Sequence, residues 1–274
     1  MSIEPPFPDL NEYTIAIGEA GRRLSEIEAT EGAAGNISMY LGWPVEVRRK
    51  FPEVETIQLP LEVPELAGGT LLVSGSGRRL REIIIDPAAN LGALVIEPGG
   101  KTGRLFTAPG RLFAQLTSEL NSHLAVHRDQ VTRTGTNFHA IVHAQPLHLT
   151  YLSHIPRYQA EAYLNRHLLR WQPELIVQIP DGIGMVEFNI PGSAALMAST
   201  VESLRSHRIV VWAKHGVMSR SDLSVKRAAD RIEYAETGAK YECMDLSYGS
   251  PAEGLSEDEI RAICKAWNVD QKIF

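Results

Sequence analysis

The amino-acid sequence is most informative at Ile209-Val210-Val211-Trp212-Ala213-Lys214-His215-Gly216, where an apolar run ends in a histidine and a glycine. Branched and aromatic residues in an unbroken apolar run are typical of a buried strand. The run follows a helical pattern at 193–207 and precedes a longer one at 222–245. This part of the chain therefore predicts helix, strand and helix in succession, with His215 just beyond the strand.

The same periodicities predict the other elements, and Ser256 with Glu259 forms a capping-box signature for a last helix that ends near residue 267. Further helices are expected at 9–29, 117–130 and 156–170, and strands at 37–41, 70–73, 83–85, 93–96, 140–143, 174–179 and 208–213. Residues 44–64 carry prolines and charges and predict an irregular excursion. Because the elements do not alternate as regular β-α-β units, we expect a mixed sheet flanked by helices, in one domain over residues 1–274.

The composition is that of a globular protein, with 274 residues, 44% hydrophobic and 22% charged. A net charge of -6 argues against nucleic acid as a partner. No apolar run approaches the roughly 20 residues that span a bilayer, and the residues after Met1 do not form a secretory signal. Cys243 and Cys264 lack metal-ligand spacing and are expected to be reduced. We therefore expect a soluble, cytoplasmic protein with no membrane partner.

Two histidines lie at the ends of predicted strands. His143 ends the strand at 140–143, and His215 follows the strand at 208–213. Neutral imidazoles in such positions can hold a divalent metal, and the alternative is a hydrogen-bonded, half-buried histidine. Gln145 and His139 share a face with His143 if that strand extends far enough.

A second histidine pair, His123 and His127, has helical i, i+4 spacing. The sequence between them is Leu-Ala-Val, without the glutamate that a zinc-protease helix uses as its base. Packing or a solvated helix face is therefore favoured over metal binding for this pair.

Three short segments could bind an anion. Ser74-Gly75-Ser76-Gly77 follows a strand, Thr117-Ser118 precedes a helix, and Gly35-Asn36 could add an amide. The alternatives are an ordinary turn, an N-cap and a helix C-cap. Glu119 suits the first turn of a helix as a surface carboxylate, but beside an anion and a metal it could move protons.

These residues resemble the class II aldolase/adducin superfamily and, within it, the branch of rhamnulose-1-phosphate aldolases. The matching segments follow the family order over roughly residues 10 to 270. They are Gly35-Asn36-Ile37-Ser38, Val73-Ser74-Gly75-Ser76-Gly77, Asp86-Pro87-Ala88-Ala89-Asn90-Leu91-Gly92, Thr117-Ser118-Glu119-Leu120, Ile141-Val142-His143, Pro180-Asp181-Gly182-Ile183-Gly184 and Trp212-Ala213-Lys214-His215-Gly216-Val217.

The resemblance implies an α/β fold: a three-layer α/β/α sandwich with a mixed, largely antiparallel sheet, in a homotetramer. It implies a carbon-carbon lyase of rhamnose metabolism that uses Zn2+ or another divalent metal. The implied reaction is cleavage of L-rhamnulose 1-phosphate, or a close ketose 1-phosphate, to dihydroxyacetone phosphate and L-lactaldehyde.

The resemblance also assigns roles to residues. It makes Glu119 the catalytic carboxylate, and His143 and His215 the first and third metal ligands. Gln145 stands where the family has its second histidine ligand. Either Gln145 ligates in its place, or His139 swings in, or the site binds metal weakly. The implied phosphate-binding residues are Asn36, Ser76, Gly77, Thr117 and Ser118.

Two other functions remain open at this point. One keeps the fold and the metal chemistry but makes the protein an epimerase, decarboxylase or dehydratase on a related sugar phosphate. The other is a non-catalytic, adducin-like interaction module. The presence of Glu119, His143 and His215 argues against the module, and Gln145 argues for it.

Overall fold

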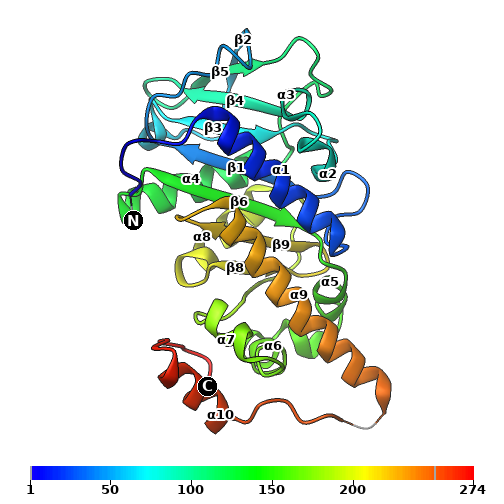
Figure 1. Cartoon of the computed structure of the whole chain (residues 1–274). Helices are drawn as coiled ribbons and strands as arrows, with labels where there is room; N and C mark the ends of the chain where they lie inside the picture. The colour runs from blue at the N-terminus through cyan, green and yellow to red at the C-terminus, as the bar shows by residue number, and fades with distance from the viewer. Residues whose placement is uncertain (1, 250) are drawn as a thin grey trace.

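The computed structural model describes residues 2–249 and 251–274, which form a nine-stranded sheet with helices on both faces (Figure 1). Its strand order is β2-β5-β4-β3-β1-β6-β9-β8-β7, and every pair is antiparallel except β7 with β8. The strands are β1 (Asn36–Leu41), β2 (Glu53–Gln58), β3 (Thr70–Ser74), β4 (Leu91–Ile96), β5 (Thr102–Thr107), β6 (Phe138–Ala144), β7 (Gly184–Val186), β8 (Ile209–Trp212) and β9 (Gly216–Ser221). The mixed, largely antiparallel sheet is thus confirmed.

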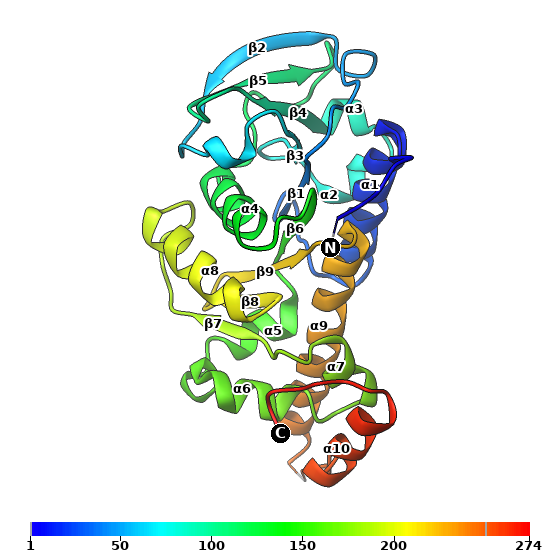
Figure 2. The ribbon, with the colours of Figure 1, turned by 90° about the vertical axis from the view of Figure 1, so that its left-hand side faces the viewer.

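Two layers of helices enclose the sheet, as the turned view shows (Figure 2). Helices α1, α2 and α9 cover one face, and α4 and α8 cover the other. The helices are α1 (Leu10–Glu26), α2 (Leu80–Ile83), α3 (Pro87–Asn90), α4 (Leu120–Thr134), α5 (Leu147–Leu152), α6 (Glu161–Leu168), α7 (Pro173–Gln178), α8 (Ala194–Ser206), α9 (Val225–Tyr248) and α10 (Glu257–Ala266), with 3-10 turns η1 (Pro64–Leu66) and η2 (Pro156–Gln159). The three-layer α/β/α arrangement is therefore confirmed.

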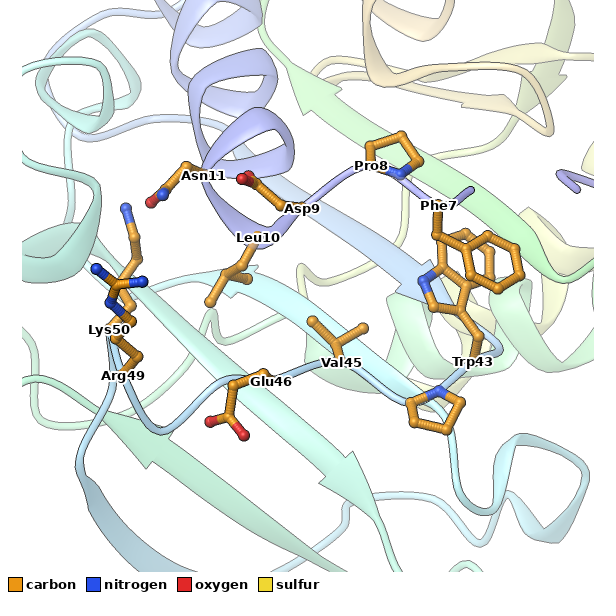
Figure 3. A pocket seen from close by; sticks show the side chains of 11 residues that line it. Phe7, Pro8, Asp9, Leu10, Asn11, Trp43, Val45, Glu46, Arg49 and Lys50 are labelled. Carbon is orange, nitrogen blue, oxygen red and sulfur yellow. The ribbon is translucent and has the colours of Figure 1, made fainter. Parts of the chain in front are cut away.

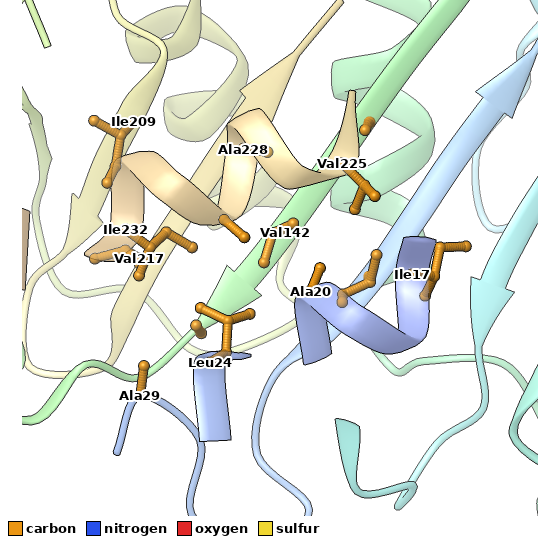
Figure 4. Close-up of a cluster of buried hydrophobic side chains, with 14 of the residues drawn as sticks. Ile17, Ala20, Leu24, Ala29, Val142, Ile209, Val217, Val225, Ala228 and Ile232 are labelled. Atoms are coloured by element: carbon orange, nitrogen blue, oxygen red, sulfur yellow. The ribbon is translucent and has the colours of Figure 1, made fainter. Parts of the chain in front are cut away.

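The largest hydrophobic cluster lies between the sheet and the helices α1 and α9 (Figure 4). Leu24 of α1 and Ile232 of α9 are fully buried against the sheet with Val142 of β6. Burying one such side chain contributes about 1.5–3 kcal/mol. This packing fixes β6, the strand that carries His143.

The predicted starts of two helices are confirmed, and a side chain caps each of them, whereas the helix predicted at 9–29 ends at Glu26. Asp9 and Glu12 form a capping box at the start of α1, and Ser256 and Glu259 form the expected one at α10. In each, a side-chain oxygen accepts a backbone N–H that the helix leaves unpaired.

The strand predicted at 83–85 is wrong, because these residues lie in α2 and the turn after it. The preceding strand, β3, already pairs with β1 on one side and β4 on the other, so it has no free edge. Ile83 is buried in the core, whereas Ile85 is exposed.

The strand predicted at 174–179 is also wrong, because Pro173–Gln178 is helix α7. Pro173 lies in the first turn, where its fixed φ favours a helix and its missing N–H costs nothing. Leu175, Ile176 and Ile179 then lie on one buried helical face.

The excursion predicted at 44–64 contains the regular strand β2, and β5, β7 and β9 were not predicted. β2 lies at the edge of the sheet, and most of its side chains are exposed, so it lacks an alternating hydrophobic pattern. The helix predicted at 117–130 begins at Leu120 and ends at Thr134, and the one at 156–170 divides into η2 and α6.

Among residues 2–249 and 251–274, no helix combines the length and the apolar character that crossing a membrane requires.

Candidate active site and metal centre

The two histidines come together at the ends of interior strands of the sheet. His143 is the penultimate residue of β6, and His215 lies in the tight turn that joins β8 to β9. Because β6 and β9 are neighbouring strands, the two rings meet with centroids 5.0 Å apart. Residues 72 positions apart in the sequence therefore form one pair, which we call the imidazole pair.

Two glycines permit this close approach. A Cβ at Gly216 would lie 2.5 Å from the carbonyl oxygen of Ala144 and 3.2 Å from Cε1 of His143. Gly35 has φ +83°, and a Cβ there would lie 2.8 Å from the carbonyl oxygen of His143. Gly35 is thus not a helix C-cap, since α1 ends at Glu26, but the turn that starts β1 beside His143.

Glu119 faces the imidazole pair from the N-cap position of α4 and is only 4% exposed. Its carboxylate oxygens lie 3.6 Å from Nε2 of His143 and 3.9 Å from Nε2 of His215. One ligand atom from each of the three residues lies within 4.8 Å of the others. Glu119 is therefore a buried carboxylate at the mouth of a possible metal site, and the surface alternative is wrong.

Burial and neighbouring groups shift the pKa of Glu119, and that of His215, in opposite directions. Burial raises the pKa of Glu119, but His143, the Asn36 amide, His123 and His215 lower it, and the net pKa is below the usual value. Burial and then His143 lower the pKa of His215, which the Glu119 charge only partly offsets. At neutral pH the carboxylate is therefore charged and His215 neutral, the forms that bind metal.

The ring nitrogens also fit a divalent metal. Nδ1 of His143 lies 2.8 Å from the carbonyl oxygen of Val217, so it donates its proton and leaves the Nε2 lone pair facing Glu119. Such a bond to the far nitrogen is how proteins orient a metal-binding histidine. Nδ1 of His215 is buried without a partner among the described residues. Two imidazoles and a carboxylate suit zinc and similar ions.

Gln145, the residue in place of a third histidine, also lines this pocket. Its backbone N–H donates to Ala29, which fixes the chain just after β6. His139 lies elsewhere: its Nδ1 is 2.9 Å from Nδ1 of His127, and it does not line the pocket. The geometry therefore favours Gln145 over His139 as the third donor.

The rest of this cavity of about 180 Å³ is lined mainly by glycines, hydroxylated residues and an asparagine. They are Gly35, Asn36, Gly75, Ser76, Gly77, Thr117 and Ser118. Ser76 and Gly77 follow β3, and Thr117 and Ser118 precede α4, whose N-terminal end favours an anion. None of the described residues that line the cavity is a lysine or arginine. Backbone N–H groups and hydroxyls are thus the donors an anion would meet.

Arg78, beside this loop, has a structural role. Its guanidinium donates to Asn90, to Glu82 and to the carbonyl of Leu112, which ties the loop after β3 to α2 and α3. The positive charge of Arg78 is therefore largely neutralised by contacts within the scaffold.

Two site residues have no signal of their own in the sequence. Pro191 lines the cavity from the loop before α8. Trp212 packs its ring 4.6 Å from that of His143 and 5.2 Å from that of His215, and its indole N–H donates to Thr200. Its position directly before the turn that carries His215 is the only clue to this contact.

A larger cavity of about 590 Å³ lies away from these residues (Figure 3). Phe7 stacks on Trp43 at one end of this cavity, with ring centroids 4.3 Å apart, and Arg49 and Lys50 lie at the other end. It contains none of the site residues predicted from the sequence. The smaller cavity is the chemically equipped one, because a carboxylate, two imidazoles and several hydroxylated residues line it together.

The family model described as Class II Aldolase and Adducin N-terminal domain matches residues 16–243. The chain belongs to this family. Its class II aldolase relatives include a rhamnulose-1-phosphate aldolase of Yersinia pestis, 31% identical over 87% of this chain and 87% of that one. Another, from Klebsiella pneumoniae, is 30% identical over 78% of this chain and 76% of that protein.

Solved structures of class II aldolases share the fold. A sugar-phosphate aldolase from Thermotoga maritima is 29% identical, with a TM-score of 0.74, and the match covers 89% of this chain and 98% of that one. An L-fuculose 1-phosphate aldolase is 17% identical with a TM-score of 0.57, over 94% and 96% of the two chains, which shows the fold alone.

Proposed function

We propose that this protein is a metal-dependent aldolase that cleaves L-rhamnulose 1-phosphate, or a close ketose 1-phosphate, to dihydroxyacetone phosphate and L-lactaldehyde. The observation that carries the proposal is the meeting of Glu119 with His143 and His215 in a cavity that hydroxylated residues and glycines also line. Relatives named rhamnulose-1-phosphate aldolase, at about 30% identity over most of the chain, support this substrate.

The proposed metal is Zn2+ or another divalent ion, held by His143 and His215 with Gln145 as the third ligand. A metal there would polarise the substrate carbonyl and stabilise the negative charge that develops beside it. Gln145 supplies a neutral oxygen instead of an imidazole, so zinc should bind less tightly than at a three-histidine site.

The residues of the chain have separate tasks in this reaction. Cleavage of the C3–C4 bond removes a proton from the C4 hydroxyl and adds one to C3. Glu119, buried and ionised at rest, would take up the proton that the C4 hydroxyl releases and then donate it to C3. Asn36, Ser76, Gly77, Thr117 and Ser118 would bind the phosphate at C1, so that binding energy at the remote end orients the reacting carbons.

We further propose that residues 1–274 act as one domain, that four copies assemble, and that the protein works in the cytoplasm. The large exposed side chains near Pro191 support assembly: Phe188 is 59% exposed and Ile190 is 71% exposed. A neighbouring copy would cover them and help to enclose the site. Light scattering of the purified protein measures its oligomeric state, and a monomer would refute the proposed tetramer.

The test of function is release of dihydroxyacetone phosphate from L-rhamnulose 1-phosphate, followed with a coupled dehydrogenase, together with metal analysis of the protein. Near-stoichiometric metal and turnover that a chelator abolishes would support the aldolase. Conversion of the sugar phosphate without dihydroxyacetone phosphate would indicate an epimerase or dehydratase. A metal-free protein that added zinc does not activate would refute the proposal.

A further inference from the structure

A line of polar side chains runs from the pocket into the interior between α4 and the sheet. Nδ2 of Asn36 lies 2.9 Å from Glu119, and Oδ1 of Asn36 lies 2.5 Å from Nε2 of His123. The Ser38 hydroxyl lies 2.6 Å from Nδ1 of His123 and 2.7 Å from Nε2 of His127. His127 continues to His139. We call Asn36, Ser38, His123, His127 and His139 the buried chain.

The side chains of the buried chain come from three elements, β1, α4 and β6. Asn36 and Ser38 are two apart on β1 and share a face of the sheet. His123 and His127 are four apart on α4 and share a face of the helix. His139 comes from β6, where it pairs with Tyr40 of β1. The views in Figures 1 and 2 place α4 against these strands.

The direction of the first hydrogen bonds is fixed by the carboxylate. An ionised Glu119 can only accept, so the Asn36 amide donates to it and the Asn36 carbonyl faces His123. Nε2 of His123 must then carry a proton. Burial lowers the pKa of His123 to about 4, so the ring is neutral and its Nδ1 is an acceptor. The Ser38 hydroxyl therefore donates to His123.

The remaining bonds follow in the same direction. With its only proton given to His123, the Ser38 oxygen accepts from Nε2 of His127. Burial lowers the pKa of His127 and His139 well below the usual value, so both rings are neutral. Nδ1 of His127 then accepts from Nδ1 of His139. Nε2 of His139 is left as a lone pair without a partner among the described residues.

All of these bonds thus donate towards Glu119. Hydrogen bonds aligned in one direction polarise one another and strengthen each other. If the Asn36 amide turned over, its carbonyl would face the carboxylate and its NH2 would face an N–H, so buried polar groups would be left unpaired, which is unfavourable. Ser38, His123, His127 and His139 are each 0% exposed, so water cannot substitute.

We propose that the buried chain is a positioning device that locks the Asn36 amide onto Glu119, so that the carboxylate points at the imidazole pair. Ser38 and His123 are then positioning residues for catalysis, although neither lines the pocket. The kinetic part of this inference rests on the proposed function, whereas the hydrogen-bond direction does not.

The kinetic test compares Ser38→Ala with Ser122→Ala. Ser38→Ala breaks the buried chain, whereas Ser122 is a buried serine beside His123 whose hydroxyl has no partner among the described residues. We expect Ser38→Ala to lower kcat about tenfold or more, the scale for lost outer hydrogen bonds, with KM and metal content little changed. Ser122→Ala should leave kcat unchanged. Equal kcat values in the two variants would overturn the proposal.

A second pair separates positioning from a general loss of packing. The amide of His127→Gln can still donate to Ser38 from the position of Nε2, whereas His127→Leu cannot. We expect His127→Gln to keep most of kcat and His127→Leu to lose it, even where thermal unfolding shows that both are destabilised. Parallel losses in the two variants would refute the positioning role.

The direction of the chain is tested without turnover by NMR of protein labelled with 15N-histidine. We expect neutral rings at pH 7 with the proton on Nε2 in His123 and His127 and on Nδ1 in His139. A proton on Nδ1 of His123, or a charged ring, would overturn the assigned direction. If the tautomers are as expected but no ketose phosphate is cleaved, the proposed function fails while the assigned hydrogen-bond direction stands.

Discussion

The imidazole pair and the buried chain contain the same residue type in opposite situations. His143 and His215 have ring nitrogens that face a cavity and a carboxylate, whereas those of His123 and His127 are all engaged in hydrogen bonds. Only a free lone pair can bind a metal. The histidine pair with helical i, i+4 spacing is therefore structural. The pair whose lone pairs are free to bind a metal comes from residues far apart in the sequence.

The largest expected effect tests the imidazole pair directly. His215→Ala removes one of two imidazole ligands, so we expect metal loss and a fall in kcat/KM of about a thousandfold, since a Lewis-acid metal contributes several kcal/mol. Metal analysis and the cleavage assay measure this. His167→Ala, a histidine on α6 outside the cavity, is the matched control. Full metal content in His215→Ala would contradict the assignment.

The next effect tests the buried chain through acid stability. Burial lowers the folded-state pKa of His123 to about 4, from the ordinary histidine value of 6.5. Between these values the unfolded chain binds the proton and the folded protein does not, so stability is full above about pH 6.5 and falls as the pH drops towards 4. His123 alone should cost about 3 kcal/mol over this range.

Denaturant unfolding between pH 7 and pH 4 measures that loss, and His123→Gln should show a weaker pH dependence. His207 is the internal contrast. Its pKa is raised: burial lowers it, but the hydrogen bond and charge of Glu161 more than offset this, so its contribution is present at low pH and lost as the pH rises. An unfolding free energy that does not change with pH would contradict the neutral state of the buried chain.

A third test concerns Glu119, where the two groups meet. Glu119→Ala should keep the metal ligands His143 and His215 but lower kcat about a hundredfold or more, the usual scale for an acid–base residue. Glu65→Ala, at an exposed position in η1, serves as the control. Unchanged turnover in Glu119→Ala, with metal retained, would remove this residue from the mechanism.

The smallest expected effect concerns Gln145, the proposed metal ligand beside the imidazole pair. Gln145→His should increase zinc affinity about tenfold, because imidazole is a better zinc ligand than an amide oxygen. Competition with a chromogenic chelator measures the affinity, and Gln172→His controls for an added surface histidine. Unchanged affinity would mean that position 145 does not reach the metal.

The sequence was sufficient for elements whose own residues specify them. Amphipathic spacing and side-chain caps identified α1 and α10. It was insufficient where the surrounding strands determine the structure of a segment. Residues 83–85 could not pair with β3, because β1 and β4 already occupy both sides of that strand. The edge strand β2 and the three-residue β7 carry too little pattern to be recognised.

The candidate site shows the same division. His143, His215 and Glu119 could be named from the sequence because each stands at the end of an element and matches a family motif. Their mutual geometry could be seen only in the folded protein. The buried chain could not be predicted, because it depends on the β1–β6 register and on the rotation of α4 about its axis.

The fluorescence of Trp212 can report on the candidate metal centre. The indole is 1% exposed and packs against both rings of the imidazole pair. The fluorescence of a buried indole is sensitive to nearby charge and is quenched by paramagnetic ions such as Co2+. Filling of the candidate metal centre should therefore be readable from the fluorescence of the unmodified protein, in real time and without substrate.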